Sequence, residues 1–229
     1  MDFLKGYWEV LLQYPVLHAF SVNLTLTFWS GLLALVLGTL MVAMRISPIS
    51  SLRLASTVYV NVFRDIPLTI VMVMMFLVVW TTLGVSFTPD NLANDFYWLS
   101  VIGLGLYHSA FVAEGLRSGV NTVPLGQAEA ARAIGLSFLQ SARLIVLPQA
   151  FRGAISPLGN TLIALIKNTT VAAAASVATE TSSTMAGMIE AHANYNFAIF
   201  FTFAIGYVII VIPVGLVVTY LSRRLAVKR

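Results

Sequence analysis

Five long apolar stretches, separated by shorter polar segments, dominate the pattern of residues along this chain. They cover residues 18–44, 56–83, 98–120, 154–177 and 197–221. A membrane-spanning helix needs about 20 mostly apolar residues, because each residue adds about 1.5 Å and the hydrocarbon layer is about 30 Å thick. The pattern therefore predicts an all-α integral membrane protein with about five spans, formed as a single transmembrane domain over residues 1–229.

Composition agrees with a chain that is solvated by lipid. Hydrophobic residues make up 59% of the sequence, charged residues 10%, and the mean hydropathy is +0.88, whereas soluble domains carry about 25% charged residues. Cysteine is absent, which excludes disulfide frameworks, thiolate metal sites and cysteine nucleophiles. The net charge of +4 does not indicate a nucleic-acid partner, because the basic residues lie between apolar runs and not in clusters with aromatic residues.

The basic residues lie mainly on one side of the predicted spans. The connector after span one, the long connector after span three with its edge at Arg117, and the C-terminal tail together hold ten of the thirteen lysines and arginines. The opposite side holds only Lys5. Basic residues in short loops are retained on the cytoplasmic side of a membrane. We therefore expect the N-terminus outside, the C-terminus inside, and the connector 121–148 in the cytoplasm.

The connector 121–148 predicts a hairpin of two short helices. Pro124 suits a first helical turn, and Gly135 can take the positive φ that ends a helix. Ser137 and Gln140 have capping-box spacing, so a second helix is expected to begin there and run towards Pro148. The apolar residues of the hairpin form one face, which suits either a groove in a cytosolic partner or the membrane surface. They are Leu125, Ala128, Ala131, Ile134 and Leu136.

The same connector carries a family resemblance. The residues concerned are Glu129-Ala130-Ala131, Gly135, Ile145 and Leu147-Pro148. In identity and spacing they resemble the EAA motif of permease subunits of bacterial ATP-binding-cassette importers. Three further segments are similar to the polar amino acid branch of that family, especially to glutamate permeases: 63–68, 113–124 and 160–169. Asp65-Ile66 and Asn168 depart from the residues that are usual there.

The resemblance implies a division of labour between several chains. In that family the motif forms a coupling helix that docks into the ATPase subunit; the residues it assigns to this contact here are Glu129, Ala130, Ala131, Arg132 and Gly135. It also implies a second homologous permease, two ATPase subunits that bind ATP and Mg, an extracytoplasmic substrate-binding protein and a bacterial cytoplasmic membrane. Independently, a P-loop needs a Gly-Lys pair, and this sequence has none. The chain is therefore expected to be a non-catalytic subunit without a cofactor of its own.

Several polar residues fall inside the predicted spans. Ionisable side chains cost about 2.5–3.5 kcal/mol near the bilayer centre, so they normally face the bundle interior and find partners. The candidates for a substrate path are Arg64, Asp65, Glu114, Asn160 and Lys167. Two interpretations fit the cations Arg64 and Lys167. They contact a substrate carboxylate, or they form structural ion pairs with Asp65 or Glu114. His108 with Ser109 predicts interhelical hydrogen bonds, and the three histidines lack metal-ligand spacing.

We expect a permease of an importer for polar amino acids, with glutamate as the substrate. Glutamine, aspartate, arginine and histidine remain alternatives within the family. An autonomous secondary transporter would need an inverted repeat or a coupling-ion site, and neither is visible. A membrane-embedded enzyme would need a clustered nucleophile, base or metal set, and a purely structural subunit would not need the hairpin.

Overall fold

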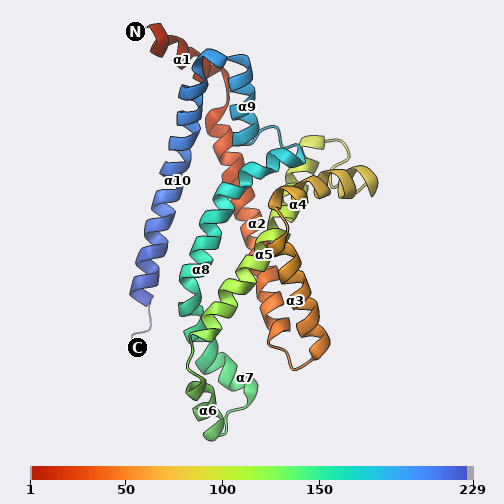
Figure 1. Cartoon of the computed structure of the whole chain (residues 1–229), viewed down its shortest axis with the longest axis vertical. Coiled ribbons are helices and arrows are strands. Elements are labelled where there is room, and N and C mark those ends of the chain that lie inside the picture. The colour runs from red at the N-terminus through yellow and green to blue at the C-terminus, as the bar shows by residue number, and fades with distance from the viewer. Residues whose placement is uncertain (1, 226–229) are drawn as a thin grey trace.

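The computed structural model describes residues 2–225, except for the side chains of Leu125, Ala128, Phe138, Leu139 and Ala142. Every regular element in this part of the chain is helical (Figure 1). The α-helices are α1 Asp2–Gln13, α2 Val16–Arg45, α3 Ser50–Asp65, α4 Leu68–Met74, α5 Leu92–Asn121, α6 Leu125–Ala133, α7 Phe138–Ser141, α8 Leu147–Asn168, α9 Thr181–Ala191 and α10 Asn196–Leu225. Two π-helices, η1 Met75–Thr82 and η2 Ala142–Val146, and two 3₁₀-helices, η3 Thr169–Ala175 and η4 Ala193–Tyr195, complete the described elements.

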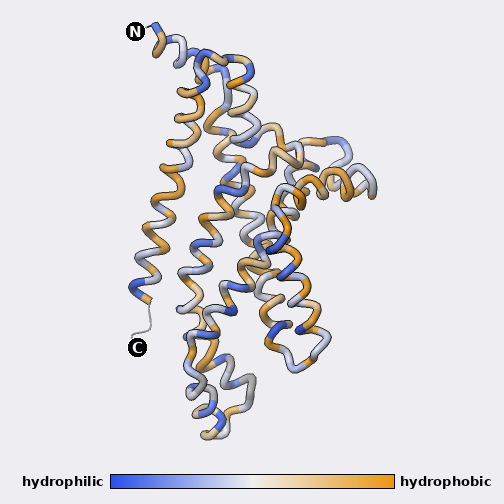
Figure 2. Tube along the Cα trace, in the orientation of Figure 1, coloured by the Kyte–Doolittle hydropathy of each residue, from blue (hydrophilic) through white to orange (hydrophobic). Residues whose placement is uncertain are grey.

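Three helices are long and apolar enough to cross a membrane: α2, α5 and the segment Ala193–Leu225 that contains α10. They contain the predicted spans 18–44, 98–120 and 197–221. Figure 2 shows hydrophobic residues along most of α10 and hydrophilic residues towards its C-terminal end. A fourth candidate is the pair Ser50–Asp65 and Leu68–Thr82, whose axes meet at 103°. By length and composition, three or four spans are thus identified in the part of the chain that the structure describes.

The predicted span 56–83 is a bent pair of helices in the structure, because the helix breaks at Pro67. Proline disfavours the helical conformation of the preceding residue, and Ile66 accordingly has φ −90° and ψ 146°. Pro67 then caps α4, which leaves the bundle at an angle and continues into η1 (Figure 1). The break directly follows Arg64 and Asp65, so these residues lie at a helix end.

The predicted span 154–177 is displaced in the structure. The helix begins earlier, at Leu147, and ends at Asn168, after which η3 and a left-handed Ser176 turn the chain towards α9. Pro148 does not end the second helix of the hairpin, because it stands in the first turn of α8, where a missing N–H costs little. η2 leads directly into α8, so the connector is continuous with the helix that follows it.

Helix α5 is the centre of the bundle and packs closely against α2 and α8. Glycine permits both close approaches. A Cβ on Gly38 of α2 would lie 2.6 Å from Cγ1 of Val112, and one on Gly119 of α5 would collide with the carbonyl oxygen of Ala150. Small residues at such crossings let helix backbones approach where lipid gives no hydrophobic driving force.

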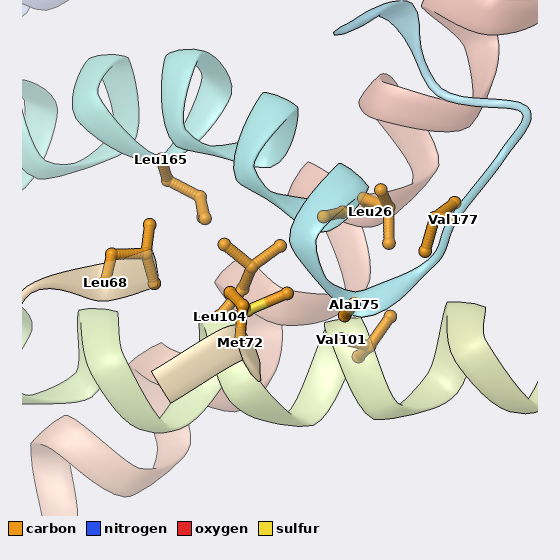
Figure 3. Packing of buried hydrophobic residues seen from close by; sticks show 9 residues of the cluster. Leu26, Leu68, Met72, Val101, Leu104, Leu165, Ala175 and Val177 are labelled. Atoms are coloured by element: carbon orange, nitrogen blue, oxygen red, sulfur yellow. The ribbon is translucent and has the colours of Figure 1, made fainter. Parts of the chain in front are cut away.

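An apolar core joins five elements where the α4 arm meets the bundle. It comprises Leu26, Leu68, Met72, Val101, Leu104, Leu165, Ala172, Ala175 and Val177. Figure 3 shows side chains from α2, α4, α5 and α8 converging with Ala175 of η3. Met72 and Leu104 are fully buried. This packing holds the bent arm against the end of α8.

A second apolar cluster lies at the N-terminal end of the molecule. Val10 of α1 packs with Met188 of α9 and with Ile199 and Phe203 of α10. Helices over residues 2–13 and 181–191 were not predicted from the sequence. The available signals were an apolar face ending at Pro15 and a possible N-cap at Glu180, whose carboxylate accepts the backbone N–H groups of Ser182 and Ser183.

Candidate functional site

Helix α6 ends in a Schellman motif, in which Gly135 takes a left-handed conformation. The φ of Gly135 is +85°. The backbone N–H of Leu136 donates to the carbonyl of Ala131 at 3.1 Å, and that of Gly135 donates to the carbonyl of Arg132 at 3.0 Å. These are the two hydrogen bonds of this C-terminal motif. The predicted helix stop at Gly135 is confirmed, and the motif also sets the angle at which the hairpin turns.

The start of the next helix is a reciprocal capping box. The backbone N–H of Ser137 donates to Oε1 of Gln140 at 2.9 Å, and the backbone N–H of Gln140 donates to Oγ of Ser137 at 3.3 Å. The spacing of these two residues predicted this arrangement. Both ends of the turn between α6 and α7 are therefore specified by residues within the turn itself.

The motif residues of the hairpin are mostly exposed. Glu129, Ala130, Arg132 and Gly135 are exposed, whereas Ala131 is 1% exposed. On the predicted apolar face Ile134 is 76% exposed, Leu136 is half-buried, and the side chains of Leu125 and Ala128 lie outside the described set. The hairpin projects from the end of the bundle formed by α5 and α8 (Figure 1). Among the described side chains, it thus presents the charged Glu129 and Arg132 and the apolar Ile134 and Leu144 outwards.

Within the bundle, Glu114 of α5 binds three arginines. Nη1 of Arg45, the last residue of α2, donates to Oε1 of Glu114. Nη1 of Arg64 lies 3.8 Å from Oε2, and Nη2 of Arg117 lies 2.7 Å from the same oxygen. Every ion pair among the described residues includes Glu114. Of the two predicted partners for Arg64, the structure therefore selects Glu114 and not Asp65.

The other three candidate path residues are not part of this cluster. Asp65, Asn160 and Lys167 have exposed side chains. Asn160 and Lys167 are seven residues apart on α8, which places them on one face of that helix. The structure thus separates the five candidates into a paired group on α3 and α5 and a pair of polar side chains on α8, with Asp65 at the break after α3.

His108 and Ser109 of α5 make the predicted interhelical hydrogen bonds, to different partners. Nδ1 of His108 lies 2.9 Å from the carbonyl of Leu104, which can only accept, so the proton is assigned to Nδ1. Nε2 then accepts from Nδ2 of Asn168, at the end of α8, at 3.1 Å. Oγ of Ser109 lies 2.8 Å from the hydroxyl of Tyr59 on α3. His108 is 1% exposed, so its ring ties α5 to α8.

A buried polar network at the opposite end of the bundle was not predicted. Nδ2 of Asn23 on α2 donates to Oγ1 of Thr169 at 2.9 Å and to the hydroxyl of Tyr207 at 3.0 Å. Oδ1 of Asn23 accepts the backbone N–H of Thr181 at 2.9 Å. Asn23 therefore links α2 to η3, α9 and α10. An asparagine inside an otherwise apolar stretch was the available sequence signal.

Glu180 completes this network as the N-cap of α9. Its carboxylate is fully buried and also accepts from Nδ2 of Asn23 at 3.4 Å. Burial raises the pKa of the Glu180 carboxyl above its ordinary value, although the hydrogen bonds from Ser182, Ser183 and Asn23 act in the opposite direction. The network thus fixes the polar segment that leads from η3 into α9.

Comparison with known proteins gives consistent matches. Residues 30–227 match the family described as binding-protein-dependent transport system inner membrane component. The glutamate transport system permease protein GluC of Corynebacterium efficiens is 47% identical over 218 residues, which cover 93% of this chain and 95% of that protein. The glutamate/aspartate import permease protein GltK of Escherichia coli O157:H7 is 31% identical, with 92% and 93% covered. A crystal structure of an amino acid ABC transporter with histidines has the same fold, with a TM-score of 0.80, 22% identity and 96% of each chain covered.

Proposed function

This chain belongs to the family of binding-protein-dependent transport system inner membrane components, and we propose that it is the permease of an ATP-binding-cassette importer for glutamate. It is a non-catalytic, multi-pass subunit of a bacterial cytoplasmic membrane. The observation that supports glutamate as the substrate is the 47% identity with glutamate permeases over nearly the whole of both chains.

The proposed topology has five spans, with the N-terminus outside and the C-terminus inside. α2, the bent pair α3–η1, α5, α8 and α10 are the five spans, of which α8 is the least apolar because it carries Arg152, Asn160, Lys167 and Asn168. The connectors after spans one and three and the C-terminal tail carry most of the basic residues. Such residues are retained in the cytoplasm, which supports this orientation. In this arrangement the hairpin lies in the cytoplasm, and α1 and α9 lie on the outer side.

The proposed partners are a second homologous permease, two ATPase subunits and an extracytoplasmic binding protein. The ATPase subunits would bind ATP and Mg. Glu129, Ala130, Ala131, Arg132 and Gly135 form the proposed contact with the ATPase. The exposure of Glu129 and Arg132 supports this, as does the locally determined turn that follows them. The outer segment with α9 is the proposed contact for the binding protein.

Continuity between the hairpin and α8 suggests how ATP binding moves the permease. When the motor closes, the docked hairpins are drawn together, and η2 transmits the movement directly to α8. α8 carries Asn160 and Lys167, and its end is bonded to α5 through Asn168 and His108. Movement of α8 thus changes the position of polar side chains at mid-depth, which is the requirement for alternating access.

The proposed path is lined by Arg64, Asp65, Glu114, Asn160 and Lys167. Lys167 is the proposed contact for a substrate carboxylate, because its side chain is exposed and makes no ion pair with any described residue. Arg64 contributes less positive charge to a substrate, because Glu114 partly neutralises it. Aspartate is the second candidate substrate, since the similar protein of Escherichia coli O157:H7 carries both substrates in its name.

The experiment that tests the proposed function is uptake of radiolabelled L-glutamate by cells that lack this chain and by cells in which it is restored. Glutamate uptake is expected to depend on the chain, whereas uptake of glutamine, arginine and histidine is not. Excess unlabelled aspartate tests whether both acidic amino acids share the importer. Glutamate uptake that is unaffected by removal of the chain would contradict the proposed substrate.

A further inference from the structure

Three consecutive polar residues lie at the end of α8: Lys167, Asn168 and the C-cap Thr169. Thr169 is fully buried, and its Oγ1 accepts a hydrogen bond from Nδ2 of Asn23 on α2 at 2.9 Å. Nδ2 of Asn168 donates to Nε2 of the buried His108 on α5 at 3.1 Å. The two residues that follow Lys167 therefore attach the end of α8 to two different helices.

The backbone around Lys167 is also held in place. Oγ1 of Thr170 donates to the carbonyl of Lys167 at 2.8 Å, and the backbone N–H of Thr169 donates to the carbonyl of Leu165. Oγ1 of Thr169 donates to the carbonyl of Ile166 at 2.7 Å. These bonds satisfy carbonyl groups that the end of a helix leaves without partners. The backbone of Lys167 thus has a defined position relative to α2 and α5, and the adjustable part of this residue is its side chain.

The groups that anchor the end of α8 to α5 are neutral. Nδ1 of His108 donates to the carbonyl of Leu104, so Nε2 of the neutral ring is an acceptor and needs a donor at position 168. The amide of Asn168 supplies this donor, whereas an ionised carboxylate of the same size has none. Lys167 is moreover the only charged residue in 153–179. The anchor therefore leaves the charge of the lysine uncompensated.

We propose that Asn168 is a specificity-determining residue of the substrate path, because it positions Lys167 without neutralising it. A lysine with its full charge favours the side-chain carboxylate of glutamate over the uncharged amide of glutamine. A carboxylate at position 168 would attract the ammonium group of Lys167 and repel an anionic substrate. Asn168 acts through Lys167 and is thus a positioning residue. This inference rests on the proposed contact between Lys167 and the substrate.

The test measures the binding of radiolabelled L-glutamate and L-glutamine to the purified complex of this chain with its permease and ATPase partners. The substrate-binding protein is left out, so that the ratio of the two affinities reports on the membrane subunits alone. A scintillation proximity assay gives this ratio without a transport step. The wild-type complex is expected to prefer glutamate.

Two variants separate the charge at position 168 from the hydrogen bond that this position makes. His108→Gln is their common background, because a glutamine amide can turn either to accept from Asn168 or to donate to an aspartate there. The second variant combines His108→Gln with Asn168→Asp, so both variants can keep the bond to α5 and they differ in charge. The preference for glutamate over glutamine should be about threefold or more lower in the double variant. Equal preferences would overturn the proposal.

A second pair of variants changes the charge beside Lys167 without altering the anchor. Ala164 lies three residues before Lys167 on α8, so their side chains are neighbours on the helix surface. Ala164→Asp should lower the preference for glutamate relative to Ala164→Asn, while the bond between Asn168 and His108 stays in place. This pair decides the matter if the double variant does not assemble. An equal preference in both would show that charge beside Lys167 does not set specificity.

Failure of this inference can be distinguished from failure of the proposed function. Glutamate uptake by cells tests whether the chain serves a glutamate importer, and such uptake persists if specificity arises in the binding protein alone. A wild-type complex that binds glutamate and glutamine equally, or binds neither, would refute the role of Asn168. The uptake experiment would then still support or contradict glutamate as the substrate.

Discussion

The backbone N–H of Leu136 donates to the carbonyl oxygen of Ala131, and this bond closes the end of α6 around Gly135. The bond spans five residues and needs a left-handed residue between its partners. It therefore connects the sequence of the hairpin directly to the angle at which Glu129 and Arg132 are presented.

Gly135→Ala is expected to weaken both glutamate uptake and the stimulation of ATP hydrolysis that drives it. A Cβ at φ +85° costs about 1–2 kcal/mol, although no neighbouring atom obstructs it. The hairpin then changes its angle, and substrate-stimulated ATPase activity and glutamate uptake of the assembled complex fall together. Gly126→Ala is the matched control, because Gly126 lies in α6 with open space around it and no positive φ. If Gly135→Ala keeps ATPase stimulation and glutamate uptake at wild-type levels, the proposed docking role of this turn is wrong.

Glu114→Gln is expected to destabilise the permease, because three arginines lose their shared counter-charge. The carboxylate is 17% exposed, so the loss is smaller than for a fully buried pair, and we expect about 1–2 kcal/mol. Thermal unfolding of the purified complex measures it. Glu9→Gln, on the exposed surface of α1, removes a carboxylate that makes no ion pair with any described residue and should leave the melting temperature unchanged. Equal melting temperatures for the two variants would argue against a structural role for the cluster.

Lys167→Gln is expected to weaken substrate handling without affecting assembly. Loss of a charge-assisted contact to a carboxylate is worth about 1.5–3 kcal/mol, so the apparent KM for glutamate should rise about tenfold or more. Lys167→Arg should restore most of the affinity, and Lys5→Gln on the exposed surface of α1 should have no effect. Uptake kinetics with unaltered KM in Lys167→Gln would show that the substrate path lies elsewhere.

Asn168→Ala is expected to loosen the contact between α8 and α5. It removes the donor to Nε2 of His108, and the unsatisfied buried nitrogen should cost about 1–3 kcal/mol. Asn160→Ala, on the same helix but exposed, serves as the comparison for stability. In thermal unfolding in detergent, Asn168→Ala should unfold at a lower temperature than Asn160→Ala. Equal unfolding temperatures would show that the hydrogen bond between Asn168 and His108 does not stabilise the fold.

Glu180 should give the stability of the outer segment a specific pH dependence. Burial raises the pKa of its carboxyl in the folded protein, so the folded state keeps a proton that the unfolded chain has released. Its contribution to stability therefore decreases as pH rises from the ordinary glutamate pKa of about 4.3 through the raised value. The difference between the unfolding temperatures of wild type and Glu180→Gln should therefore change with pH across this range, because the glutamine side chain does not titrate. Glu190→Gln, exposed on α9, should parallel the wild type; a parallel curve for Glu180→Gln would contradict the raised pKa.

The sequence by itself determined the features that depend on neighbours along the chain. Apolar runs identified α2, α5 and α10 because a membrane span is defined by its own composition. The turn at Gly135 and the capping box of Ser137 and Gln140 were predicted because their hydrogen bonds close within a few residues. Pro67 broke its helix for the same local reason.

Only the tertiary structure decided which polar groups meet across the bundle. Arg45 and Glu114 are 69 positions apart in sequence, and Asn23 and Glu180 are 157 apart. Such pairs depend on the rotation and the axial position of packed helices, which glycines such as Gly38 set through close approaches. A sequence shows that a charge inside a membrane needs a partner, but several partners satisfy that need equally. Helix packing selects one of them, and here it gave Glu114 three arginines and left Lys167 without an ion pair to any described residue.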